Sequence, residues 1–161
     1  PSNAAAIKRA MGKSLQERVV ATLPPPANPD AQPGEWLPFV TDTIAAAEAE
    51  HEQKLVDRLR EEGVGGVDEC LAMLQDGRLH LLVVPWSTSV TVYRGSDGRV
   101  AASAEEARAL APEGGGPEAL SLIEVLPELV RSTGTRLELV EGAAEERLVE
   151  ELGGMAGLRR W

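Results

Sequence analysis

The sequence has few cysteines and few aromatic residues, and both shortages limit what the protein can be. Its single cysteine, Cys70, excludes a disulfide within the chain and a zinc site built from several thiolates. Only 3% of the 161 residues are aromatic, so a core must be built from leucine, valine and alanine. The hydrophobic fraction of 43% is sufficient for the core of one ordinary domain.

Positive charge is also scarce, with 16 Lys and Arg residues against 26 Asp and Glu residues. The formal net charge of −10 argues against a chain that binds nucleic acid without specificity, because phosphate contacts need lysine and arginine. The first twenty residues carry +3 and residues 21–161 carry −13. The charged residues of this basic segment are Lys8, Arg9, Lys13, Glu17 and Arg18.

No apolar run reaches the length of a membrane-spanning helix, since the longest, LHLLVVPW at residues 79–86, has the size of a strand. No leader of charged, apolar and small residues precedes the first helical pattern, so nothing in the sequence indicates export. We therefore expect a reduced cytoplasmic protein with no membrane partner.

Residues 1–33 are predicted to lie outside the main domain. The opening PSNA resembles a remnant of tag cleavage. Residues 4–20 are predicted to form a basic helix that leads into a strand-like segment, RVVATL. The following PPPANPDAQPG is predicted to be a linker, because proline fixes φ and lacks the backbone donor of regular structure.

The remaining residues, 34–161, alternate between helical and strand patterns and are predicted to form one α/β domain. A long helix is predicted from Trp36 to Glu62, where apolar residues recur every three or four positions. Gly63 is expected to end this helix in the left-handed conformation of a helix C-cap.

Short apolar segments between the helical patterns are predicted to be strands of a mixed, largely parallel sheet. A hairpin is predicted where SVTVYR is followed by GSDG. A short helix is expected at 104–111, then a loop, APEGGGPEA, and then one helix from residue 120 to Gly134. Three strands are expected to lie side by side in one sheet: 79–84, 135–140 and 154–160.

The spacing of reactive residues indicates no catalytic or metal-binding cluster. Three glycines at 63, 65 and 66 precede a helix, but no Gly-Lys-Ser/Thr follows, so a phosphate-binding loop is not indicated. HEQKL at residues 51–55 lacks the second histidine of a zinc-protease helix. His80 is interpreted as a residue on the face of a sheet, and Cys70 as a small buried residue.

The glutamates of the last helical pattern, residues 143–152, are predicted to form a solvated face rather than a pair of catalytic carboxylates. We therefore expect a protein that is not an enzyme and that has no metal site and no cofactor.

Three segments, in order, resemble one known domain: GGVDECLAMLQDGRLHLLVV at 65–84, LPELVRSTGTRLELVEG at 126–142 and LGGMAGLRRW at 152–161. They resemble the third domain of archaeal and eukaryotic peptide-chain release factors and of Pelota, in particular the bacterial archaeo-eukaryotic release factor-like branch. The resemblance covers nearly all of residues 36–161. It implies a three-layer α-β-α sandwich related to the kink-turn-binding ribosomal proteins, with SLQERVVATLP similar to the end of the preceding middle domain.

The resemblance also implies a contact site at the start of a helix, formed by Gly66, Val67, Asp68 and Glu69. In the related RNA binders the matching positions read Gly-(Thr/Ala)-Asn-Glu, and the Asn and Glu contact sheared G·A pairs. Asp68 in place of that asparagine removes an amide donor and adds a negative charge. No Lys or Arg lies between Glu61 and Asp76, and Arg78 is the nearest cation in the sequence, so we expect RNA binding to be lost.

Two family features are missing from the sequence. No cysteine occurs where many relatives carry a zinc-knuckle-like insertion, and the Gly-Gly-Gln of the hydrolytic middle domain does not occur. The resemblance therefore implies a non-catalytic binding module that associates with the ribosome or with a translation-factor protein, as the domain of the cellular release factors binds a partner GTPase. The alternative is a domain that binds structured RNA, kink-turn or ribosomal, through residues 66–69, which the net charge disfavours.

Overall fold

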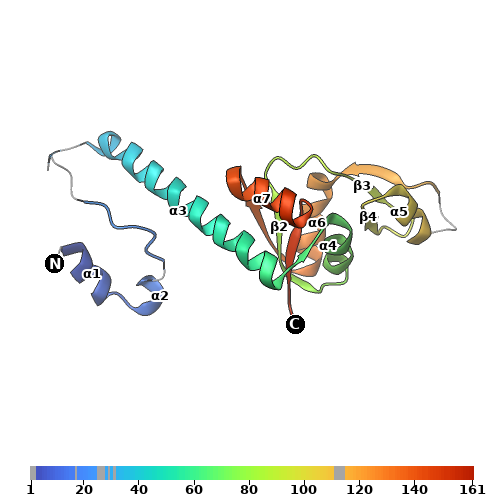
Figure 1. Cartoon of the computed structure of the whole chain (residues 1–161), viewed down its shortest axis with the longest axis horizontal. Helices are drawn as coiled ribbons and strands as arrows, with labels where there is room; N and C mark the ends of the chain where they lie inside the picture. The colour runs from blue at the N-terminus through green and yellow to red at the C-terminus, as the bar shows by residue number, and fades with distance from the viewer. Residues whose placement is uncertain (1–2, 17, 25–27, 29, 31, 111–114) are drawn as a thin grey trace. The chain divides into compact units, whose positions relative to one another are not determined.

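The structure is a computed structural model that describes residues 3–16, 18–24, 28, 30, 32–110 and 115–161. The chain divides into two compact units, Pro1–His51 and Glu52–Trp161 (Figure 1). Helix α3 (Pro33–Glu62) contributes its first part to one unit and its last part to the other. No helix of the described residues is long and apolar enough to cross a membrane.

The first unit contains two short helices, α1 (Asn3–Ala10) and α2 (Lys13–Gln16). The predicted single helix over residues 4–20 is wrong, because the chain leaves the helical conformation at Met11 and Gly12, where glycine loses most entropy on becoming helical. The predicted strand-like segment, RVVATL, is also wrong: residues 18–23 form no strand, since a strand requires a pairing neighbour. The long helix begins at Pro33 rather than at Trp36, and proline suits the first helical position.

The second unit is a mixed α/β structure, as predicted. After α3 the elements follow in the order β1 (Val64–Gly65), α4 (Val67–Gln75), β2 (Leu79–Pro85), β3 (Thr91–Arg94), β4 (Val100–Ala101), α5 (Ala104–Leu110), β5 (Glu118–Ser121), α6 (Leu122–Thr133), β6 (Arg136–Val140), α7 (Gly142–Leu152) and β7 (Ala156–Arg159).

The main sheet has the strand order β1-β7-β2-β6, so the three predicted strands do lie side by side. Only β2 and β6 are parallel, whereas β7 is antiparallel to both β1 and β2. The expectation of a largely parallel sheet is therefore wrong. The alternation of helices and strands identifies strands in the sequence, but the direction of each strand depends on the path of its connection.

A second, smaller sheet has the order β4-β3-β5 and is antiparallel throughout. The predicted hairpin is confirmed as β3 and β4. Strand β5 was not predicted, since its residues were assigned to a loop and to the start of a helix. Residues Glu118–Ser121 become a strand because they pair with Thr91–Arg94, and helix α6 therefore begins only at Leu122.

Strand β2 contributes to two hydrophobic clusters through side chains on its two faces. Leu82 and Val84 pack into a cluster with residues of α4 and α6, including Leu71, Leu74, Val125 and Leu126. Leu81 and Val83 pack into the other cluster with residues of α3 and α7, including Leu55, Val56, Leu59 and Leu148. Burial on both faces explains why this strand is a continuous apolar run in the sequence.

Candidate functional site

The predicted contact residues, Gly66 to Glu69, lie at the start of α4, where Gly66 is the N-cap with φ 94°. Its backbone N–H donates to Leu152 O, at the end of α7, at 2.8 Å and to Met155 O, just before β7, at 2.9 Å. Its carbonyl oxygen accepts from Cys70 N at 3.1 Å. The backbone of Gly66 is therefore satisfied within the chain, and its N–H is not free for a phosphate.

The neighbouring glycines are explained by close packing of backbone segments. A Cβ at Gly63 would lie 2.4 Å from Leu59 O and 3.0 Å from Gly157 O, and a Cβ at Gly65 would lie 3.0 Å from Leu152 O. The predicted left-handed conformation of Gly63 is wrong, because its φ is not positive. Glycine is needed here for space rather than for a helix C-cap.

The four predicted residues do not act as one surface. Val67 is half-buried and packs against the core, whereas Asp68 and Glu69 are exposed. Glu69 forms an ion pair with Arg159 of β7, with 3.6 Å between the guanidinium nitrogen and the carboxylate oxygen. The expectation that no cation offsets the charge of Glu69 is therefore wrong, since the fold brings in an arginine that lies far away in the sequence.

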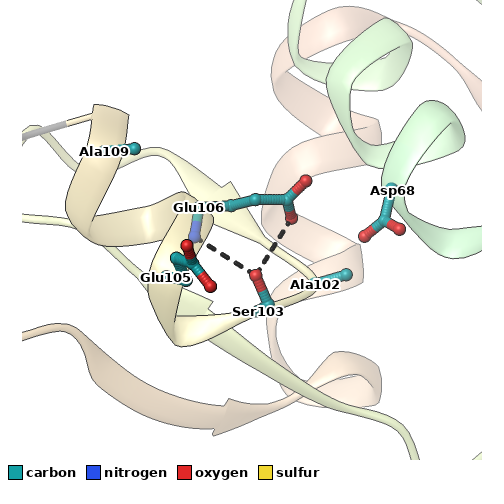
Figure 2. A pocket seen from close by; sticks show the side chains of 6 residues that line it. All are labelled: Asp68, Ala102, Ser103, Glu105, Glu106 and Ala109. Carbon is teal, nitrogen blue, oxygen red and sulfur yellow. Dashed lines mark hydrogen bonds between the residues drawn. The ribbon is translucent and has the colours of Figure 1, made fainter.

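Asp68 lies at the rim of a groove between α4 and the segment formed by β4 and α5, which we call the α4–α5 groove (Figure 2). Two adjoining hollows make up the groove, with volumes of about 470 and 290 Å³. Both are lined by Asp68, Ala102, Glu106 and Ala109. In Figure 2 the carboxylates of Asp68 and Glu106 point toward each other across the hollow.

Gln75, in the last turn of α4, joins this helix to β4 in the way that a neighbouring strand would. Its side-chain Nε2 donates to Val100 O at 2.8 Å, and its Oε1 accepts from Val100 N at 2.7 Å. The same Nε2 also donates to Leu71 O at 3.1 Å. Because both backbone groups of one β4 residue are held by one side chain, Gln75 fixes the separation of the groove walls.

The wall formed by α5 begins with Ser103, whose side chain caps the first turn of this helix. Ser103 Oγ accepts from Glu106 N at 3.2 Å and lies 3.4 Å from Glu106 Oε2. Arg99, at one end of the groove, bonds Asp76 through Nη2 at 3.1 Å. The carboxylates of Asp68 and Glu105 form no hydrogen bond or ion pair with any residue that the structure describes. The groove thus presents negative charge at Asp68 and Glu105 that no described residue pairs with.

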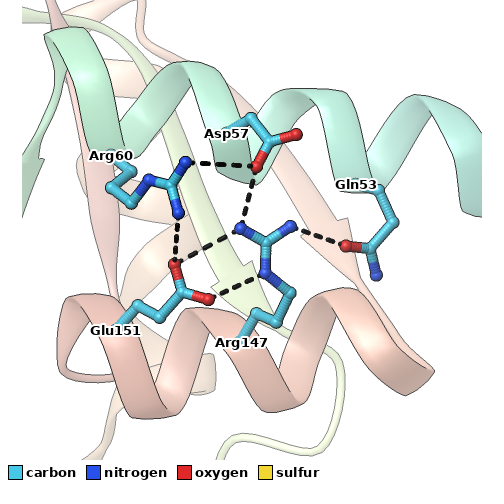
Figure 3. A network of polar contacts seen from close by, with 5 residues as sticks. All are labelled: Gln53, Asp57, Arg60, Arg147 and Glu151. Atoms are coloured by element: carbon cyan, nitrogen blue, oxygen red, sulfur yellow. Dashed lines mark hydrogen bonds and ion pairs between the residues drawn. The ribbon is translucent and has the colours of Figure 1, made fainter.

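A second polar arrangement, the Arg147 network, joins α3 and α7 within the second unit (Figure 3). Arg147 donates to Gln53 Oε1 at 2.7 Å, to Asp57 Oδ1 at 2.8 Å and to Glu151 Oε1 at 2.8 Å. Arg60 adds longer ion pairs to Glu151 at 3.5 Å and to Asp57 at 3.8 Å.

Hydrogen bonds from Arg147 lower the pKa of the Asp57 carboxyl and of the Glu151 carboxyl. In return, the hydrogen bonds to Glu151 and then to Asp57 raise the pKa of the Arg147 guanidinium. All three groups are therefore charged at neutral pH, and the network fastens the last part of α3 to α7.

Cys70 and His80, the reactive residues considered in the sequence, both contact the backbone of the fold. Cys70 is fully buried, its Sγ lies 3.7 Å from Val64 O, and burial raises the pKa of its thiol to about 12, so the prediction of a small buried residue is confirmed. His80 is exposed on β2 with Nδ1 2.9 Å from Arg159 O. Within the described part of the chain, no group of three or more His, Cys, Asp or Glu residues could hold a metal ion.

The glutamates predicted to form a solvated face do so only in part. Glu146 and Glu150 are exposed on α7, but Glu151 belongs to the Arg147 network and Glu145 accepts from Ser87 Oγ. Arg147 and Glu151 lie four residues apart on α7, but the bonds of Arg147 to Gln53 and Asp57 and the bond of Ser87 to Glu145 join residues that are far apart along the chain.

Comparison with known proteins supports the fold. No protein-family model matches the sequence, and the comparison with curated proteins gives no match. Among solved structures, the chain is similar to the C-terminal domain of a peptide chain release factor from Methanosarcina mazei, with a TM-score of 0.56 and 12% identity. The match covers 82% of this chain and 97% of that chain. At this identity the likeness shows a shared fold, that of a release-factor C-terminal domain.

Proposed function

We propose that residues 34–161 are the non-catalytic binding module of a bacterial release-factor-like protein, with a three-layer α-β-α architecture. The module docks on the ribosome or on a translation-factor protein in the cytoplasm. The observation that carries this proposal is the backbone likeness to a release-factor C-terminal domain, which extends over 97% of that domain.

The chemistry of the described residues is consistent with binding rather than catalysis. The one cysteine is buried with a raised thiol pKa, which disfavours the reactive thiolate. The surface carboxyls whose pKa is lowered, Asp57 and Glu151, are joined to Arg147 in an ion network between two helices. Networks of this kind alter pKa values for structural reasons.

The alternative function is recognition of structured RNA through Gly66 to Glu69. The ion pair of Glu69 with Arg159 favours it, because this pair removes part of the charge that opposes phosphate. Against it stand the satisfied backbone of Gly66 and the uncompensated carboxylate of Asp68. We therefore prefer docking through protein contacts.

Sedimentation through a sucrose cushion tests the proposal. The chain, mixed with purified bacterial ribosomes at physiological salt, should enter the pellet, or it should be retained by a purified translation factor in a pull-down. An unrelated acidic protein of similar net charge serves as the control. Absence of the chain from both the ribosome pellet and the translation-factor fractions would contradict the proposed function.

A further inference from the structure

We propose that the α4–α5 groove docks a protein partner through a segment that carries arginine or lysine between apolar residues. This inference rests on the proposed function and gives its partner a chemical description. It is drawn from the shape of the groove, the residues of its floor and the charge at its rim.

The floor of the groove is apolar and its side chains are small. Val100 and Ala101 of β4 are buried beneath it, and alanines line it from both helices, Ala72 on α4 and Ala109 on α5. Leu110 adds an apolar side chain that is 49% exposed. Alanines leave room for the side chains of another molecule, and an incoming aliphatic chain would bury apolar surface against them.

The rim carries negative charge on both sides. Asp68 lies on the α4 side, and Glu105 and Glu106 lie on the α5 side. The only cation that lines the groove in the described part of the chain, Arg99, is already paired with Asp76. Carboxylates that face each other without a cation repel, and a guanidinium or ammonium group between them would relieve this repulsion.

The charge and shape of the groove favour a basic protein segment over a nucleic acid or a metal ion. Phosphate would meet like charge at Asp68 and Glu106, which disfavours a nucleic acid. A metal ion is disfavoured because these carboxylates belong to no group of three or more candidate ligands among the described residues. Arginine and lysine match both parts of the groove, since their aliphatic stems can lie on the alanines while their charged ends reach the rim.

The groove is also held open in advance of binding. Gln75 bonds both backbone groups of Val100, and the Ser103 side chain caps the start of α5. Because the groove is already formed, binding does not require its walls to become ordered. This lowers the entropic cost of binding and favours affinity.

Fluorescence polarisation with the full chain at physiological salt tests this inference. Two labelled peptides of identical arginine, leucine and alanine composition are used as probes, one with the residues arranged for a helix and one for an extended strand. At least one should bind. Ala109→Trp, which fills the groove from an exposed position of α5, should abolish that binding, whereas Ala143→Trp at an exposed position of α7 should not.

Charge reversal is the second arm of the experiment. The double variant Asp68→Lys, Glu105→Lys should weaken binding roughly tenfold or more, since each exposed charge pair contributes modestly. The matched control is Glu146→Lys, Glu150→Lys, which makes the same change in net charge on the exposed face of α7. Circular dichroism of each variant verifies that the fold is retained.

The outcomes are distinct. Equal weakening by the α7 control would show attraction to overall charge alone and would overturn the groove assignment. Failure of both peptides to bind, or full binding by Ala109→Trp, would also overturn it. None of these results affects sedimentation with ribosomes, so the groove can fail while the proposed function stands through another surface.

Discussion

The Arg147 network and the α4–α5 groove both contain carboxylates on neighbouring helices. They differ in whether a cation is paired with those carboxylates. In the network, Asp57 and Glu151 are joined to one guanidinium by hydrogen bonds of 2.8 Å (Figure 3). In the groove, the carboxylates of Asp68 and Glu106 point toward each other (Figure 2), and Arg99, the only cation among the described residues that line it, is paired with Asp76. The first arrangement stabilises the fold, and the second leaves charge for another molecule.

Arg159 and Arg160, at the end of the chain, form contacts within the fold, as Arg147 does. Arg160 donates to Leu79 O at 2.8 Å and to Thr133 O at 2.7 Å, and Arg159 is paired with Glu69. Arg160 thus holds the residue after β7 to β2 and to the end of α6, whereas Arg159 joins β7 to the start of α4. Positive charge in this unit is therefore largely engaged within the fold, which strengthens the contrast with the unpaired carboxylates of the groove.

The largest effect on stability is expected from breaking the network. Arg147→Met should lower the free energy of unfolding, because it leaves two carboxylates near each other and removes the contacts that fasten α3 to α7. Urea denaturation at neutral pH measures the change. Arg108→Met, at an exposed position of α5, is the control and should change little. A variant as stable as the parent would show that the network contributes nothing.

The same network should make stability depend on pH. Because the pKa of Asp57 and of Glu151 is lowered from 3.8 and 4.5, their contribution is fully present above those ordinary values. It is lost as the pH falls through the lowered values. The difference in unfolding free energy between the parent chain and Arg147→Met should therefore narrow at acidic pH, as measured by urea titrations at several pH values. A constant difference would contradict the assignment.

A smaller effect on the free energy of unfolding is expected from replacing Gln75, the neutral side chain that joins α4 to β4. Gln75→Ala removes two hydrogen bonds to Val100 and leaves the backbone N–H and C=O of Val100 without these partners. This loss should lower the free energy of unfolding by about 1–3 kcal/mol. Thermal and urea denaturation measure this cost. Gln53→Ala is a useful comparison, since its amide accepts one bond from Arg147. A loss for Gln75→Ala no greater than that for Gln53→Ala would mean that the bridge to β4 is weak.

The smallest effect on stability is expected at the groove rim. Asp68→Asn and Glu105→Gln should change the free energy of unfolding by less than about 0.5 kcal/mol, because neither carboxylate has a partner to lose. The removal of like charges favours the variants, whereas the loss of a carboxylate from the first turn of α4 or of α5 disfavours them, so the two effects should nearly cancel. A loss above about 1 kcal/mol would show that these carboxylates have a structural role and would remove the contrast with the network.

The sequence predicted those parts of the fold that depend on local pattern. The apolar run at 79–84 is the central buried strand, and Cys70 is buried as its setting on a helix indicated. Strand β5 could not be predicted, because residues 118–121 are strand only through pairing with β3. The direction of β7 likewise depends on the path of the chain rather than on its own residues.

The candidate site was predicted only in part, for the same physical reason. Residues 66–69 do start a helix, but the partner of Glu69 is an arginine of the last strand. No sequence motif indicates the α4–α5 groove. One wall is α4, which precedes β2 in the sequence, and the other is formed by β4 and α5, which follow β2. One local signal was present, the Ser-x-x-Glu of residues 103–106, in which Ser103 caps the start of α5.

The most direct test of the preference for protein over RNA is a polarisation titration of the full chain with kink-turn RNA and with a scrambled duplex at physiological salt. The account predicts equal, weak binding to both, because Gly66 is satisfied by backbone carbonyls and Asp68 opposes phosphate. Any residual affinity should disappear when Lys8, Arg9, Lys13 and Arg18 are replaced by alanine and should fall steeply with salt. Tight binding specific to the kink-turn, and abolished by Asp68→Ala, would contradict the account.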